Sequence, residues 1–82
     1  MSEADARRLA AKLAREAFDA RTDLRSPDGA RVLPSFEPSR FEGGLKAQRW
    51  SFRFSPPSGA SARVSFDRLG GNPVVEVGYS DE

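Results

Sequence analysis

The sequence RWSFRF at residues 49–54 alternates aromatic residues with serine and arginine. Successive side chains of a β-strand point to opposite faces of the sheet, so strict alternation separates the two kinds of side chain. The stretch therefore predicts a strand with its aromatic side chains in the core and its polar side chains in water.

The same alternation recurs twice further along the chain. Apolar residues occupy every second position in 62–66 and again in 75–79, and the turn-forming sequences SPPSGA and RLGGNP separate the three runs. Residues 48–79 are therefore predicted to form an antiparallel β-meander with one buried face.

Placing all inward side chains on one side of the sheet fixes the expected register, because a slip by one residue would turn a whole strand over. On the inner face the expected pairs are Phe54–Ala62, Phe52–Val64 and Trp50–Phe66, then Phe66–Val75, Val64–Val77 and Ala62–Tyr79. On the outer face they are Arg49–Asp67, Ser51–Ser65, Arg53–Arg63 and Ser65–Glu76.

Residues 2–20 are predicted to form a helix. Ser2 and Asp5 have the spacing of a capping box. The basic residues, including Arg7, lie mostly off a single apolar stripe with helical spacing. The stripe consists of Ala6, Leu9, Ala10, Leu13, Ala17 and Phe18. Because its many alanines make a thin hydrophobic face, we expect the helix to pack on the sheet of its own domain rather than on a membrane surface.

Residues 26–47 are predicted to be an irregular and hairpin region. Residues 26–29 form a turn by composition, and the prolines keep residues 35–39 out of a central strand. Gly43-Gly44 is expected to be a two-residue hairpin turn between residues 40–42 and 45–47. Whether residues 31–41 contribute a strand is open. The predicted fold is α+β in a single domain, with an N-terminal helix packed on a three- or four-stranded antiparallel meander.

The composition argues against most enzyme chemistry. The 82 residues include neither cysteine nor histidine, so thiol nucleophiles, the commonest general base and the commonest transition-metal ligand are all missing. The sequence contains neither Ser-x-x-Lys nor a phosphate-binding loop motif. We therefore expect a non-catalytic protein without cofactor or metal. The charged N-terminal stretch lacks the apolar region of a secretory signal, and no apolar run has membrane-spanning length, so we expect a cytoplasmic setting.

The outer face of the sheet is the candidate binding surface, and its aromatic-free character argues against a base-stacking platform. The candidate partner-binding residues are Arg49, Ser51, Arg53, Arg63, Ser65 and Arg68. Their arginines and serines suit a carboxylate-rich protein surface. The favoured function is a small protein-binding module that covers its target, such as an inhibitor, immunity or adaptor protein.

Two alternatives stay open. In one, Arg49, Arg53, Arg63 and Arg68 contact phosphates of a nucleic acid, although the net charge of the chain is only +1. In the other, the chain is a homodimeric structural or accessory subunit, paired through an edge strand at residues 74–79.

A helix followed by Trp-x-Phe-x-Phe and then by ARVSFDRLGGNPVVEV resembles small helix-plus-meander domains of the PepSY type. It is also similar to certain small immunity proteins of bacterial toxin systems. The matching residues are Trp50, Phe52, Val64, Phe66, Asp67, Gly70 and Val75. Both groups bind or inhibit a protein, so the resemblance implies a protein partner.

Overall fold

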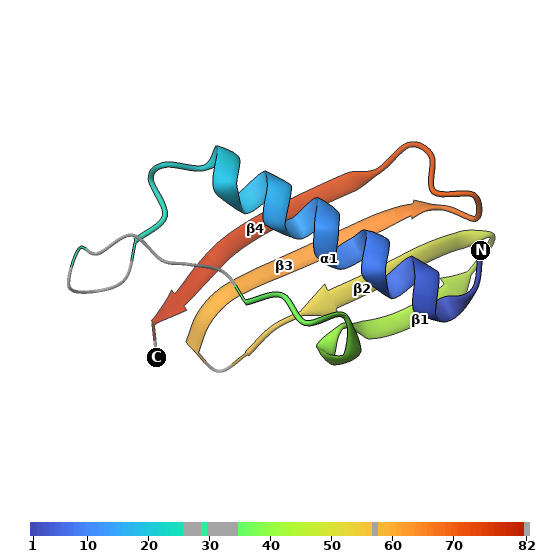
Figure 1. Cartoon of the computed structure of the whole chain (residues 1–82), viewed down its shortest axis with the longest axis horizontal. Helices are drawn as coiled ribbons and strands as arrows, with labels where there is room; N and C mark the ends of the chain where they lie inside the picture. The colour runs from blue at the N-terminus through green and yellow to red at the C-terminus, as the bar shows by residue number, and fades with distance from the viewer. Residues whose placement is uncertain (26–28, 30–34, 57, 82) are drawn as a thin grey trace.

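A long helix lies across one face of a four-stranded antiparallel sheet (Figure 1). The computed structural model describes residues 1–25, 29, 35–56 and 58–81. Its elements are α1 (Glu3–Ala20), the 3₁₀ helix η1 (Pro38–Arg40), β1 (Glu42–Lys46), β2 (Arg49–Phe54), β3 (Ser58–Asp67) and β4 (Val74–Asp81). The strands are neighbours in the order β1-β2-β3-β4, so the predicted α+β fold is confirmed, with four strands in the meander.

The N-terminus of α1 is capped as the sequence predicts. Ser2 Oγ accepts a hydrogen bond from the backbone N–H of Asp5 at 3.2 Å. This bond is one half of a capping box and satisfies one of the free N–H groups of the first turn. The Asp5 carboxylate contacts the guanidinium of Arg8, one turn further along the helix.

The side of α1 that faces the sheet is built mainly from alanine. Ala6, Ala10 and Ala14 are completely buried, whereas Leu9 and Leu13 are only half-buried at the side of the stripe. Small side chains at the centre of the contact allow the helix axis to lie close to the sheet. The helix therefore contributes close packing, and the bulk of the core comes from the strands.

The register between β2 and β3 is the expected one. Trp50 pairs with Phe66, Phe52 with Val64, and Phe54 with Ala62. All six side chains are buried beneath α1. The RWSFRF stretch is thus a core strand, and its arginines point away from the core.

The register between β3 and β4 differs from the expected one by two residues. Val64 lies opposite Val75, so the predicted pairing of Phe66 with Val75 is wrong. The predicted outer pair Ser65–Glu76 is also wrong, because Glu76 lies opposite Arg63. A shift by two residues leaves every side chain on its predicted face.

The cause of this shift is a turn that closes earlier than expected. The backbone N–H of Asp67 donates to the carbonyl of Gly71 at 2.9 Å, so the chain has already reversed at Gly71, and Val74 comes to lie opposite Ser65. Within the turn, Asp67 Oδ1 accepts hydrogen bonds from the N–H groups of Leu69 at 2.9 Å and Gly71 at 2.8 Å. The carboxylate therefore holds the loop in its tight form.

Acid is expected to weaken this turn. The backbone hydrogen bonds from Gly71 and Leu69 hold the pKa of Asp67 below its ordinary value of 3.8. A carboxyl whose pKa is lower in the folded chain stabilises the fold above its unfolded pKa, and this contribution is lost as the pH falls through the folded pKa. Asp67→Asn keeps an oxygen acceptor but no longer titrates. We therefore expect the melting temperature of the wild type to fall more steeply than that of Asp67→Asn between about pH 5 and about pH 2.

Thermal unfolding followed by circular dichroism measures how the melting temperature of each protein depends on pH. The other carboxyl groups titrate in both proteins, so their effect cancels in the comparison. Equal slopes would show that the Asp67 carboxylate contributes nothing to the acid sensitivity.

The predicted turn at Gly43-Gly44 is wrong, because β1 runs through both glycines. The chain reverses instead at Ala47 and Gln48, whose φ angles of 52° and 64° are both in the left-handed region. A two-residue hairpin turn of type I′ requires positive φ at both central positions. The expected strand over residues 40–42 is also wrong in part, since Arg40 ends η1.

An aromatic cluster that the sequence pattern did not place closes one end of the core. Phe36 makes edge contacts with Phe18 and Phe54, with ring centroids 5.9 and 5.3 Å apart. Phe41 is only 1% exposed and lies 5.2 Å from the ring of Phe54. Residues 35–41 therefore pack on the core as an irregular segment with one 3₁₀ turn and add no strand. Residues 31–34, the rest of the segment whose strand was left open, lie outside the described residues.

Candidate interaction surface

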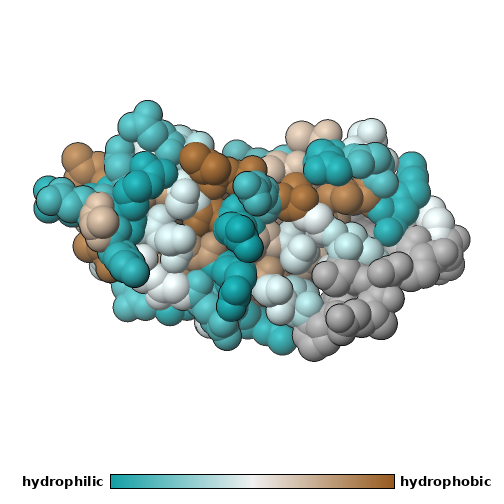
Figure 2. Space-filling model, turned by 180° about the vertical axis from the view of Figure 1, so that it is seen from behind, coloured by the Kyte–Doolittle hydropathy of each residue, from teal (hydrophilic) through white to brown (hydrophobic). Residues whose placement is uncertain are grey.

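The face of the sheet opposite α1 is open to solvent. In the part of the chain that the structure describes, α1 is the only long helix, and it lies on the other face (Figure 1). Seen from this open side, hydrophilic side chains form a band across the middle of the face, with paler residues on either side of it (Figure 2). The candidate binding residues of β2 and β3 lie on this face.

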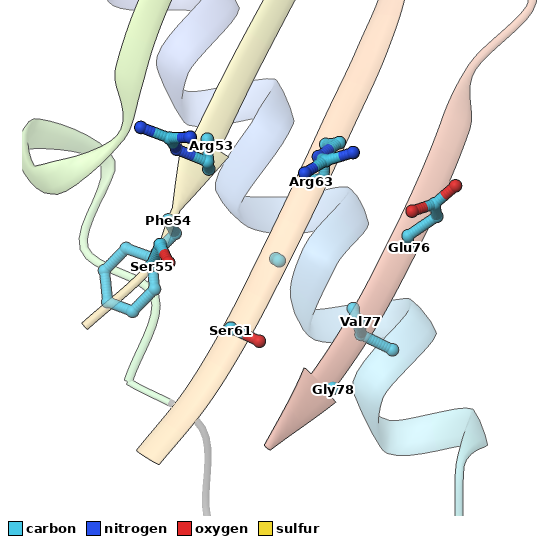
Figure 3. A pocket seen from close by; sticks show the side chains of 9 residues that line it. Arg53, Phe54, Ser55, Ser61, Arg63, Glu76, Val77 and Gly78 are labelled. Carbon is cyan, nitrogen blue, oxygen red and sulfur yellow. The ribbon is translucent and has the colours of Figure 1, made fainter. Parts of the chain in front are cut away.

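A row of four charged residues, one from each strand, crosses this face. The strand registers place Glu42 opposite Arg53, Arg53 opposite Arg63, and Arg63 opposite Glu76. The side chains of Arg53, Arg63 and Glu76 lie on three neighbouring strands and project to the same side (Figure 3). All four residues are exposed. We call these four residues the charged row.

The charged row is not neutralised by ion pairs of its own. The ion pairs among the described residues join Arg7 to Glu3, Arg8 to Asp5 and Arg21 to Asp23, all outside the row. Like charges directly opposite each other on a sheet are mildly destabilising. An oxyanion bound between Arg53 and Arg63 would remove this repulsion and accept hydrogen bonds from both guanidinium groups.

Mostly small residues flank the charged row, so the face is flat around its two arginines. The next row contains Gly44, Ser51, Ser65 and the exposed Val74, and the row on the other side contains Ser61 and Gly78. A partner can therefore approach the arginines without obstruction from neighbouring side chains. A shallow hollow of about 240 Å³ opens beside Arg53, Arg63 and Glu76 (Figure 3).

Arg49 and Ser65 lie on the predicted face, but they are joined to each other. Arg49 Nη2 donates to Ser65 Oγ at 3.4 Å and to the carbonyl oxygen of Asn72 at 3.3 Å. Arg49 also lies opposite Asp67. These contacts tie β2 to the β3–β4 turn, so Arg49 supports the sheet at that end and is only half-exposed.

Arg68 is exposed in the β3–β4 loop, beyond Asp67, whereas Arg53 and Arg63 pair near the other end of β2. The structure thus brings Ser51, Arg53, Arg63 and Ser65 together and leaves Arg68 apart from them. It adds Glu42 to the surface, and it places Glu76, which was expected on this face opposite Ser65, opposite Arg63. The correct strand boundaries and register would have identified both glutamates, because each lies directly opposite one of the arginines.

Arg7 departs from its predicted place on the polar side of the helix. Its guanidinium lies 5.6 Å from the ring centroid of Phe52, donates to the carbonyl oxygen of Phe41, and bonds Glu3 Oε1 at 2.8 Å. Its contacts attach α1 to β2 and to the segment that precedes β1. Spacing alone gave no signal for this, since a long side chain can bury its stem while its charged end finds a partner.

Among the described residues, no three side chains of His, Cys, Asp or Glu come together in a cluster that could hold a metal ion. In the same part of the chain, no helix combines the length and the apolar character needed to cross a membrane.

No protein-family model matches this chain, and neither a curated protein nor a solved structure matches it. Its function must therefore be inferred from the chemistry of its own surface.

Proposed function

We propose that this chain is a small, non-catalytic protein-binding module that covers a partner protein with the open face of its sheet. The observation that supports this most directly is the charged row on a flat, uncovered face. Arginine is well suited to such a contact, because its planar guanidinium can bind a carboxylate through two parallel hydrogen bonds. Inhibitor, immunity and adaptor proteins all act in this way, by occupying a surface. We also propose a cytoplasmic setting, as the charged N-terminal stretch led us to expect.

The charge pattern favours a protein over a nucleic acid. Two arginines occupy the centre of the row and Glu42 and Glu76 occupy its ends, so the four side chains together carry no net charge. A phosphate backbone is uniformly negative and would be repelled by both ends. A protein surface with carboxylates at its centre and lysine or arginine at its margins would match all four positions.

Reversing the two central charges should abolish the contact. We expect the tagged wild-type protein to capture one stoichiometric partner from a nuclease-treated lysate of its own organism. The amount of partner captured by Arg53→Glu/Arg63→Glu should be lower by about tenfold or more. The double change replaces attraction by repulsion at the centre of the interface. Captured protein is measured by quantitative mass spectrometry against the bait.

The matched control is Lys12→Glu/Arg15→Glu, which changes the net charge equally on exposed positions of α1. It should capture the partner as the wild type does. If both double variants lose the partner equally, the effect is one of overall charge and the sheet face is not the interface.

The nucleic-acid alternative predicts a different result. Without nuclease the eluate would contain nucleic acid, after nuclease no protein would remain bound, and the binding would collapse between about 50 and 200 mM salt. A protein interface with a partly buried charged row should lose much less over the same range.

A further inference from the structure

The two edges of the sheet differ in how well they are protected. β1 is five residues long, has charged residues at both ends, and contains Gly43 at a φ of 142°. Charges and local distortions are the usual means by which edge strands avoid pairing with other chains. β4 is eight residues long, and Glu76 is the only charged residue between Val74 and Ser80.

An incompletely buried apolar strip runs beside the open edge of β4. Leu9 and Leu13 of α1 and Val75 and Val77 of β4 pack against the core but are only partly buried, and Tyr79 is half-buried as well. Hydrophobic surface shows along part of the upper margin of the molecule in Figure 2. A strand added along β4 would bring its own inward side chains over this strip.

We propose that β4 pairs antiparallel with β4 of a second copy, about a two-fold axis at Val77, to give a continuous eight-stranded sheet. Both helices would then lie on the same side, and the two open faces would join into one surface. No other strand among the described residues pairs with the outer edge of β4. A second copy would pair its own β4 with this edge in the opposite direction, so each strand would supply the hydrogen-bond donors and acceptors that the other needs.

The side chains of β4 select this register. Residues directly opposite in neighbouring strands point to the same face, so inner residues must pair with inner residues. An axis at Glu76 would place two carboxylates directly opposite each other. An axis at Gly78 would place the acidic Asp81 in register with the apolar Val75. An axis at Val77 pairs Val77 with itself, Val75 with Tyr79, and Glu76 with Gly78.

Position 78 allows a direct test, because it would lie opposite Glu76 of the second copy. A Cβ at Gly78 would meet only Ser61 Oγ, at an ordinary contact distance of 3.6 Å, so a side chain fits there without strain. In a two-fold dimer each substitution acts twice. Gly78→Glu creates two pairs of like charges across the interface, whereas Gly78→Lys creates two pairs of opposite charges.

We expect sedimentation equilibrium of the full chain to show a wild-type dimer. Gly78→Glu should raise its dissociation constant by about tenfold or more, and Gly78→Lys should leave it unchanged or lower it. Circular dichroism spectra matching the wild type would show that both variants fold. The proposal does not depend on the two arginines of the charged row, so Arg53→Glu/Arg63→Glu should dimerise as the wild type does.

A wild-type protein that stays monomeric up to about 1 mM would overturn the proposal, since a dissociation constant above that concentration is too weak for a specific dimer. A dimer that neither variant perturbs would place the interface elsewhere and overturn it too. Equal weakening by both variants would show that position 78 does not face Glu76, and the register about Val77 would be wrong.

Discussion

Replacing Trp50 with alanine is expected to lower the free energy of unfolding by about 3 to 5 kcal/mol. Trp50 is 7% exposed, lies opposite Phe66 across β2 and β3, and stacks on Phe52 with ring centroids 5.7 Å apart and 9° between the planes. Removing the indole leaves a cavity between strand and helix that close-packed neighbours fill only in part. A domain of 82 residues has a total stability of about 4 to 12 kcal/mol, so the loss would remove much of it.

Urea unfolding followed by circular dichroism measures this effect, since the variant has no other tryptophan for fluorescence. The matched control is Trp50→Phe. The indole Nε1 is buried and has no hydrogen-bond partner among the described residues, so phenylalanine removes an unsatisfied donor while keeping most of the ring. We expect it to cost less than about 1.5 kcal/mol. If Trp50→Ala unfolds at the same urea concentration as the wild type, the assignment of Trp50 to the core is wrong.

The register of β2 and β3 could be predicted because both strands alternate strictly and have large apolar residues on one face only. The alternation specifies which face each side chain takes, but it leaves a shift by two residues undetermined. Between β3 and β4 that shift depends on how tightly the turn closes. It closes through the Asp67 carboxylate and two backbone N–H groups, which composition alone does not reveal.

The hairpin between β1 and β2 could not be predicted from turn residues. Glycine adopts positive φ at little cost, so Gly43-Gly44 is the expected turn, whereas Ala47 and Gln48 are uncommon at positive φ. Tertiary packing overrides this local preference. The error had a consequence for the surface, because only a β1 that runs through both glycines brings Glu42 opposite Arg53. The two arginines of the charged row and the face taken by Glu76 were thus predictable from alternation. The partner of Glu76 and the place of Glu42 were not.

Substituting Gly43 with alanine is expected to detach β1 from β2 and to lower the free energy of unfolding by at least about 3 kcal/mol. At the φ of 142° that Gly43 adopts, a side chain is strained in any surroundings. A Cβ there would also lie 1.9 Å from the carbonyl oxygen of Ser51, an overlap with backbone that only movement of the strand can relieve. The two costs act at one position, and β1 has only five residues with which to compensate.

Gly44→Ala is the matched control, because a Cβ at Gly44 meets no atom within 4 Å and its φ is not positive. It should change the free energy of unfolding by no more than about 0.5 to 1 kcal/mol, with alanine losing less backbone entropy on folding than glycine. Hydrogen exchange of the Lys46 amide, which the two-residue turn pairs with Arg49 of β2, reports on β1 separately from global unfolding. Fast exchange in Gly43→Ala with normal protection in Gly44→Ala would confirm that Gly43 allows the two backbones to approach. Equal protection in both variants would mean that β1 can shift to accept the methyl group. The close contact with Ser51 would then not explain the glycine at position 43.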